Sequence, residues 1–316
     1  MSKRSCLYCY TTLGQDEHDF HPTCSKKFFG QTLIPEAPFS DGDLKHLALQ
    51  TVKSKKVVPG VQPKLLLDLA KKQGEKQPER FTIVGLWGSY ILKPPTPQFA
   101  QLPEAEDATM QMAKAMGINT VPHSLIRLKN QQLAYITKRV DRQKGKKLAM
   151  EDMCQLTERL TEHKYLGSYE QIAKALLKYA SNPGIEVVNF YELVLFCFLT
   201  GNNDMHLKNF SLLHDGKGNY RLSPAYDLVP SSLFMPEDTE ELALTLNGKK
   251  NKIKWSDFTT AMEKAHITAK TGEYLLQKAR KTLDKGLHVM DRSFLSEDFK
   301  NRFRDLIDIR LKQLKA

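Results

Sequence analysis

Three polar side chains between apolar segments have the types that phosphoryl transfer requires. Asp204 and Asn209 stand five residues apart in "TGNNDMHLKNF", directly after the apolar run "YELVLFCFL". In this chemistry one acid can accept a proton from the attacking hydroxyl, while an amide and a second acid hold magnesium against the phosphate charge. Asp227 is the candidate second acid, because "NFSLLHDGKGNYRLSPAYDLVP" predicts a hairpin that returns Asp227 to Asn209.

The spacing D-x-x-x-x-N is that of the catalytic loop in protein kinases. His206 lies inside this loop, and we expect it to brace Asp204 rather than to transfer protons. Asn202 and Asn203 suit tight turns and are expected to shape the loop.

Residues upstream of this loop could bind a nucleotide. Lys93 ends the apolar strand "YILKPP", where an ammonium group could reach the phosphates, and Glu106 is preferred over Glu104 as its partner on the next helix. The other candidate nucleotide-binding residues lie in a glycine turn and in "YITKRVD", where an adenine could bind backbone groups: Gly60, Val61, Gln62, Ile136 and Lys138.

The first residues of the chain contain a metal-ligand pattern. "CLYCYTTLGQDEHDFHPTC" has a C-x-x-C pair followed by an H-x-x-C pair, which matches four tetrahedral zinc ligands: Cys6, Cys9, His21 and Cys24. Four protein ligands leave no open position, so the predicted site is structural. His18 is a rival ligand, and Phe28 and Phe29 are expected to pack this segment onto the main body.

The order of elements predicts an α+β protein with two lobes. Strand-like runs and one helix, "PEAEDATMQMAKAMG", come first, and helical patterns dominate beyond Asp141. The helical patterns include "KLAMEDMCQLTERL", and a short helix is expected after Ser40. We expect a zinc knuckle at 1–40, an ATP-binding N-lobe at 41–138 and a helical C-lobe with the catalytic loop at 139–316.

The composition favours a soluble protein with an anionic partner. The chain has 316 residues, 41% of them hydrophobic, and a formal net charge of +11. Its basic residues form short scattered runs, so direct binding to nucleic acid is not the favoured interpretation. We expect a cytoplasmic protein, because we find neither a signal peptide nor an apolar run approaching the roughly 20 residues of a membrane span.

Taken together, these segments resemble the HipA family of bacterial serine/threonine kinases, which are toxins of toxin–antitoxin systems. The resemblance rests on motifs that match the family in order over most of residues 50–230: "VVPGVQPKLLL", "YILKPP", "EAEDATMQMAKAMGI", "YITKRVDR", "LAMEDMCQL", "TGNNDMHLKNFSLL" and "LSPAYDLVP". It implies a kinase-like fold that uses ATP and Mg²⁺, with Asp204 as the base, Asn209 and Asp227 as metal ligands and Lys93 as the ATP lysine.

The resemblance also implies partners. Known members phosphorylate aminoacyl-tRNA synthetases and are silenced by an antitoxin that binds DNA, so this chain would meet DNA only indirectly. It departs from longer members, because a zinc knuckle stands where they carry an N-terminal subdomain, which could here be a separate small protein. It also has Val57 and Pro59 where the family's loop carries a self-phosphorylated serine. Two alternatives stay open: a small-molecule phosphotransferase, and a catalytically silent kinase-fold binding module.

Overall fold

The computed structural model describes residues 4–39, 64–70, 80–84, 87–143 and 145–315. The chain forms two compact units. Unit 1 comprises Met1–Asp107, Val121–Arg139 and Arg292–Phe294, and unit 2 comprises Ala108–Thr120, Val140–Asp291 and Leu295–Ala316. The helix expected after Ser40 and the glycine turn with Val57, Pro59, Gly60, Val61 and Gln62 lie outside the described residues.

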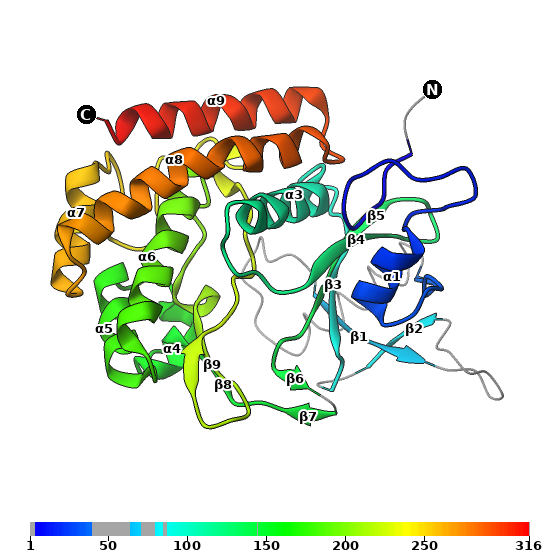
Figure 1. Ribbon diagram of the computed structural model, residues 1–316, viewed down its shortest axis with the longest axis horizontal. Helices are drawn as coiled ribbons and strands as arrows, with labels where there is room; N and C mark the ends of the chain where they lie inside the picture. Colours follow the sequence, from blue (N-terminus) through cyan, green and yellow to red (C-terminus); the bar gives the residue numbers. More distant parts are fainter. Residues whose placement is uncertain (1–3, 40–63, 71–79, 85–86, 144, 316) are drawn as a thin grey trace. The chain divides into compact units, whose positions relative to one another are not determined.

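Unit 1 contains a five-stranded antiparallel sheet with the strand order β2-β1-β3-β5-β4 (Figure 1). Its strands are β1 (Leu65–Ala70), β2 (Arg80–Ile83), β3 (Tyr90–Lys93), β4 (His123–Arg127) and β5 (Leu133–Lys138). The expected hairpin of "VPHSLIRL" and "QLAYITKRV" is confirmed, because β4 and β5 pair antiparallel. Lys93, the last residue of β3, is aligned with Tyr135 of β5.

The N-terminal segment packs onto this sheet. Helix α1 (Pro22–Phe29) has proline in its first turn and ends at Gly30, whose φ of 83° is the left-handed conformation that glycine adopts without strain. Phe28 contacts Tyr90 of β3, and Phe29 contacts Phe81 of β2, with ring centroids 6.1 and 5.9 Å apart. The expected packing of these phenylalanines is therefore confirmed, and α1 shares the core of unit 1.

Helix α3 (Leu102–Ala115) carries Glu104 in its first turn and is followed by Gly117 with φ 90°. Its residues up to Asp107 belong to unit 1 and the rest to unit 2. The buried residues Glu106 and Asp107 therefore stand in unit 1 with β3 and β4.

Unit 2 is mainly helical. Its long helices are α5 (Tyr169–Tyr179), α6 (Pro183–Leu199), α7 (Trp255–Lys264), α8 (Ala269–Asp291) and α9 (Glu297–Gln313). Helix α6 is apolar on nearly all sides because it is buried, and it contacts α5, α8 and α9 (Figure 1). Among the helices that the structure describes, none combines the length and apolarity needed to cross a bilayer.

Small strands frame the loop after α6. A three-stranded sheet has the order β10-β9-β8, with β8 (Met150–Asp152), β9 (Ser211–His214) and β10 (Tyr220–Leu222). A two-stranded ribbon joins β6 (Arg142–Gln143) to β7 (Lys146–Lys147), and single 3₁₀ turns occupy η1 (Thr161–His163), η2 (Leu207–Asn209) and η3 (Ser231–Leu233). The predicted hairpin around "HDGKGN" is confirmed by the pairing of β9 with β10.

The helix expected for "KLAMEDMCQLTERL" is wrong in its first half. The chain forms β8 there, followed by the one-turn helix α4 (Met153–Leu156). Met150 pairs with Leu213 of β9, and Asp152 caps α4 in a reciprocal pair of hydrogen bonds with Gln155. Pairing with a strand some sixty residues later overrides the apolar periodicity of this segment.

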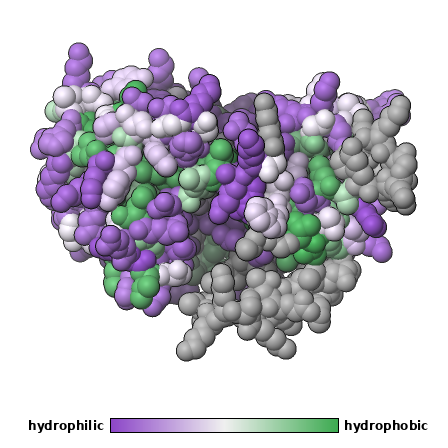
Figure 2. Space-filling model, turned by 90° about the horizontal axis from the view of Figure 1, so that it is seen from below, coloured by the Kyte–Doolittle hydropathy of each residue, from purple (hydrophilic) through white to green (hydrophobic). Residues whose placement is uncertain are grey.

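Hydrophilic side chains predominate over the coloured part of the face drawn in Figure 2, with smaller groups of hydrophobic ones between them. This surface agrees with a chain in which 26% of residues are charged.

Candidate functional site

Gly201 sets the start of the loop that carries the candidate catalytic residues. It follows the last residues of α6 with φ 67°, and a Cβ at this position would collide with Ser232 Oγ and Leu306 Cδ2. Only glycine combines this conformation with this close packing. The chain can therefore leave α6 in a tight turn and enter the loop 202–209, which carries the candidate polar residues.

Amide side chains tie this loop to the irregular segment after β10 that carries Asp227. Asn202 Nδ2 donates to Asp227 O at 3.4 Å, and Asn202 Oδ1 accepts from the Asp204 amide at 3.3 Å. Asn209 Nδ2 donates to Asp204 O at 3.0 Å. The structure thus brings together Asp204, Asn209 and Asp227 through hydrogen bonds to backbone atoms.

Asn203 has a structural role in the same loop. Its side chain contacts Ser231 Oγ at 2.5 Å, Asp238 Oδ2 at 3.1 Å and Glu240 O at 3.0 Å. The expectation that Asn202 and Asn203 shape the loop is confirmed by these contacts.

The hairpin positions Asp227 beside the loop. Tyr226 OH donates to Lys208 O at 3.0 Å and lies 2.6 Å from Ser211 Oγ, which fixes the residue next to Asp227 against η2 and β9. Asp227 itself has φ 61°. A left-handed aspartate is uncommon and persists where the surroundings enforce it, as at functional sites.

Tyr165 holds the carboxylate of Asp204. Its hydroxyl donates to Asp204 Oδ1 at 2.5 Å. Burial, followed by the charge of Asp204, raises the pKa of the Tyr165 hydroxyl, so this donor keeps its proton. Tyr165 was not predicted from the sequence, because it precedes Asp204 by 39 residues in an irregular segment without a motif.

His206 does not brace Asp204 with its side chain, contrary to expectation. Its backbone amide donates to Asp204 O at 2.9 Å, while its ring packs edge-on against Tyr165 with centroids 5.0 Å apart. Within the described residues, His206 Nδ1 has no hydrogen-bond partner. Burial lowers the pKa of His206 to about 4, although the charges of Asp204 and Asp227 oppose this shift. The imidazole is therefore neutral at neutral pH and supports Tyr165.

Unit 1 pairs Lys93 with Glu106. Lys93 Nζ lies 2.5 Å from Glu106 Oε1, and the residues are 4% and 0% exposed. Lys93 Nζ also lies 5.4 Å from the centre of the Tyr135 ring, a cation–π distance. A buried carboxylate that fixes an ammonium group is the arrangement that the sequence predicted for Glu106 rather than Glu104.

The backbone at the end of β5 offers less to an adenine than expected. Ile136 is paired with Leu92 and with Ser124 inside the sheet, and the Lys138 amide donates to Pro122 O at 2.9 Å. The Lys138 ammonium lies over the rings of Phe28 and Tyr90, and burial lowers its pKa. The Lys138 amide therefore lacks the freedom that the sequence interpretation assumed.

The four predicted metal ligands come together in unit 1. The ligand atoms of Cys6, Cys9, His21 and Cys24, hereafter the Cys/His cluster, all lie within 4.8 Å of one another. His18 is not part of this group in the described region. A hydrogen bond from Cys6 is the largest cause that lowers the pKa of the Cys9 thiol to about 4. Three thiol groups and one imidazole are a donor set that suits zinc.

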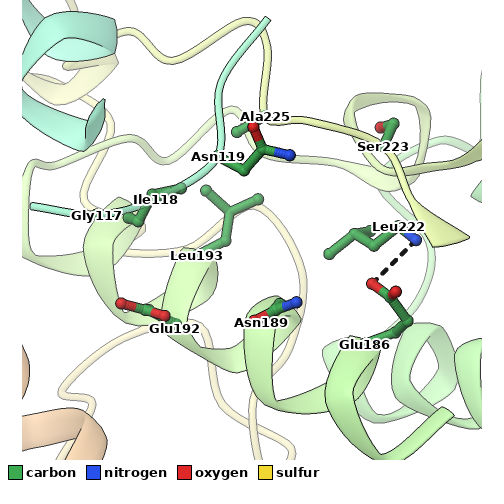
Figure 3. Close-up of a pocket in the computed structure, with 10 residues that line it drawn as sticks. All are labelled: Gly117, Ile118, Asn119, Glu186, Asn189, Glu192, Leu193, Leu222, Ser223 and Ala225. Carbon is green, nitrogen blue, oxygen red and sulfur yellow. Dashed lines mark hydrogen bonds between the residues drawn. The ribbon is translucent and has the colours of Figure 1, made fainter. Parts of the chain in front are cut away.

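A separate cavity of about 110 Å³ lies within unit 2 (Figure 3). Its wall includes Glu186, Glu192, Asn189 and Ser223, and the Leu222 amide donates to Glu186 Oε2 at 3.2 Å. Burial raises the pKa of Glu186. None of the residues predicted to form the site lines this cavity.

Comparison with known proteins assigns the family. Residues 57–287 match the family described as the HipA-like C-terminal domain. The chain belongs to the HipA family. A "Putative kinase" of Haemophilus influenzae is 29% identical over 249 residues, which are 74% of this chain and 68% of that protein. "Putative kinase Y4dM" of Sinorhizobium fredii is 31% identical over 64% of this chain and about half, 51%, of its own length.

Two solved structures share the fold of this HipA-family chain. One is HipA of Shewanella oneidensis in a complex with HipB and operator DNA, with a TM-score of 0.69, 21% identity, and coverage of 89% of this chain and 73% of that one. The other is the Helicobacter pylori proinflammatory kinase CtkA, with a TM-score of 0.56, 16% identity, and coverage of 79% and 93%. The mixed α/β fold is therefore one that occurs in kinases.

Proposed function

We propose that this HipA-family chain is an ATP- and Mg²⁺-dependent kinase that phosphorylates a serine or threonine hydroxyl of a protein. The observation that carries the proposal is that hydrogen bonds link the loop of Asp204 and Asn209 to the segment that carries the second carboxylate, Asp227. Phosphoryl transfer needs an oriented nucleophile and charge stabilisation, and these three side chains have the types for both tasks.

Asp204 orients the attacking hydroxyl and accepts its proton. Tyr165 occupies Asp204 Oδ1, whereas Oδ2 has no hydrogen bond within the described part of the chain, which leaves it to the substrate. The bond from Tyr165 also limits rotation of the carboxylate, and a fixed base loses less entropy in the transition state. His206, neutral and packed on Tyr165, supports this geometry indirectly.

Asn209 and Asp227 would hold magnesium. Asn209 donates through Nδ2 to Asp204 O, so its Oδ1 remains an acceptor that can face a cation. Carboxylate and amide oxygens are the ligands that Mg²⁺ prefers, and the residues present therefore fit this ion. Magnesium, when bound with ATP, neutralises the charge that develops on the phosphate oxygens.

Lys93 would contact the phosphates of ATP from unit 1. Glu106 holds the lysine ammonium by a 2.5 Å ion pair, so the group is oriented before a nucleotide binds. Pre-orientation lowers the entropy lost on binding.

The biological role proposed here follows from the family. The structural relative HipA was solved with HipB and operator DNA. We assign to this chain a DNA-binding antitoxin as partner, a second small protein as a further partner, and translation as the process it inhibits. An aminoacyl-tRNA synthetase is the proposed class of substrate, and the net charge of +11 suits an acidic protein surface.

Labelled ATP tests this function. Purified chain is incubated with γ-labelled ATP, Mg²⁺ and a bacterial lysate, and labelled bands are identified by mass spectrometry. The proposal predicts a labelled protein that disappears with Asp204→Asn and persists with Asp284→Asn, an exposed acid on α8. Label on a small molecule alone would indicate a small-molecule phosphotransferase, and no transfer with intact ATP binding would indicate a silent binding module.

A further inference from the structure

We propose that the Cys/His cluster is a structural zinc site, and that its metal holds Tyr10 in the contact that orients the Lys93–Glu106 pair. Two features of unit 1 have no part in the proposed kinase chemistry: the four clustered ligands, and a series of buried hydrogen bonds that begins at Tyr10, the residue after Cys9.

The ligand geometry is prepared for a metal. His21 Nε2 lies 3.2 Å from Thr12 O and 3.7 Å from Glu17 Oε2, and both of these atoms are acceptors. Nε2 therefore carries the hydrogen, which leaves the Nδ1 lone pair facing Cys9 Sγ at 3.5 Å and Cys24 Sγ at 3.7 Å. Small side-chain rotations can close these atoms on one zinc ion, whose bonds to sulfur are about 2.3 Å.

The backbone of Tyr10 is held by its connection to Cys9 and by a hydrogen bond to Cys6, which are two of the ligands. Tyr10 directly follows Cys9, and its amide donates to Cys6 O at 2.9 Å. Its φ is 62°, a left-handed conformation that a tyrosine keeps only where its surroundings determine it. A metal that binds Cys6 and Cys9 supplies this constraint directly.

The side chain of Tyr10 connects the cluster to α3. Its hydroxyl donates to Asp107 Oδ2, and His123 Nδ1 of β4 lies 2.6 Å from Asp107 Oδ1. Both oxygens of this fully buried carboxylate are therefore held from outside the helix. Asp107 is the neighbour of Glu106, so Tyr10 fixes the turn of α3 that presents the partner of Lys93.

Further contacts tie the N-terminal segment to β4. Leu7 O accepts hydrogen bonds from Ser124 Oγ at 3.1 Å and from the Leu125 amide at 3.3 Å. Arg127 pairs with Asp19 at 2.9 Å. The segment is short, and a bound metal is a common means of keeping such a small segment folded.

Metal content tests the site itself and does not depend on the proposed kinase function. The full chain is purified without chelator or metal resin, and zinc is measured by elemental analysis. We expect about one zinc per chain for the wild type and for His18→Ala, an exposed histidine of the same loop, and a large loss for His21→Ala. Replacement by Co²⁺ should give the visible absorption of a tetrahedral thiolate site. Absence of zinc from the wild type, or equal loss in both histidine variants, overturns the site.

The affinity for ATP tests the proposed coupling between the Cys/His cluster and the Lys93–Glu106 pair. This part of the inference rests on the proposed kinase function. Tyr10→Phe keeps the ring and the ligands but removes the bond to Asp107. We expect it to retain its zinc, to weaken ATP binding about tenfold, and to leave the KM for the protein substrate unchanged. Removal of zinc from the wild type should lower ATP affinity reversibly. This second measurement tests the coupling even if the Tyr10→Phe variant does not fold. Unchanged ATP affinity in zinc-free wild type overturns the coupling, and failure of the wild type to bind ATP refutes the kinase proposal instead.

Discussion

The two units hold their candidate site residues by different physical means. In unit 1, Lys93 and Glu106 form a buried ion pair between a strand and a helix. In unit 2, Asp204 and Asp227 are partly exposed, and hydrogen bonds from Tyr165 and Asn202 position them on irregular backbone. Substitutions of Lys93 or Glu106 should therefore cost stability as well as function, whereas those of Asp204 or Asp227 should mainly cost function.

The largest expected effect is the loss of activity in Asp204→Asn. Asparagine cannot accept the proton, so kcat should fall by about 10²–10⁴-fold, the usual contribution of a general base. The melting temperature should stay close to that of the wild type, because the variant keeps the loop's backbone hydrogen bonds. Turnover and thermal unfolding of the same preparation check this, with Asp284→Asn as the control. Near-normal turnover of the variant would show that Asp204 is not the base.

Substitutions of the two glutamates of α3 should differ in their effect on the free energy of unfolding. Glu106→Gln leaves the buried Lys93 ammonium without its carboxylate, and breaking a buried pair in this way costs about 3–5 kcal/mol of unfolding free energy. Glu104→Gln, two residues earlier in sequence and partly exposed, should cost far less. Urea unfolding measures both. Equal stabilities would mean that the pair contributes little to unit 1.

Acid should destabilise unit 2 through His206. Its pKa is about 4 in the folded protein and 6.5 as the ordinary value, so the unfolded chain binds the proton more tightly. The contribution of neutral His206 to the free energy of unfolding is complete above pH 6.5 and is lost as the pH falls toward 4. The free energy of unfolding should fall by at most about 3 kcal/mol over this range. His206→Asn should flatten the pH dependence of the unfolding free energy, whereas His18→Asn should not. Parallel pH curves for all three proteins would contradict the burial of a neutral imidazole.

The smallest expected effect belongs to Tyr165→Phe. Loss of the hydrogen bond to Asp204 should lower kcat about tenfold, the size of one hydrogen bond to a charged group, and leave ATP affinity unchanged. Steady-state kinetics with Tyr179→Phe, an exposed tyrosine of α5, as the control isolates the hydroxyl. A change in the KM for ATP with unchanged kcat would place Tyr165 in binding rather than in orientation of the base.

Local signals predicted the parts of the site that depend on short-range structure. The turn "HDGKGN" between two apolar runs predicted the hairpin that returns Asp227, and ligand spacing alone predicted the Cys/His cluster. The partner of Lys93 followed from the position of Glu106 on a helix after β3. These predictions succeeded because turn chemistry and helix geometry act over a few residues.

Contacts between distant segments could not be read in the same way. Tyr165 reaches Asp204 across 39 residues, and β8 forms only because β9 is available to pair with it. His206 was expected to brace Asp204 because it is near in sequence, yet its ring turns to Tyr165 and its burial keeps it neutral. The engaged amide of Lys138 likewise depends on Pro122, a neighbour set by sheet pairing.

Magnesium-dependent ATP binding tests most directly the assignment of Asp204 as the base and of Asp227 as a magnesium ligand. Calorimetric titrations of ATP are made with and without Mg²⁺ for the wild type, Asp204→Asn and Asp227→Asn. Asparagine tolerates the left-handed backbone at residue 227, so this variant keeps its fold and loses one negative ligand. The account predicts that Mg²⁺ strengthens ATP binding to the wild type and to Asp204→Asn but not to Asp227→Asn. Equal enhancement by Mg²⁺ in all three proteins would contradict it.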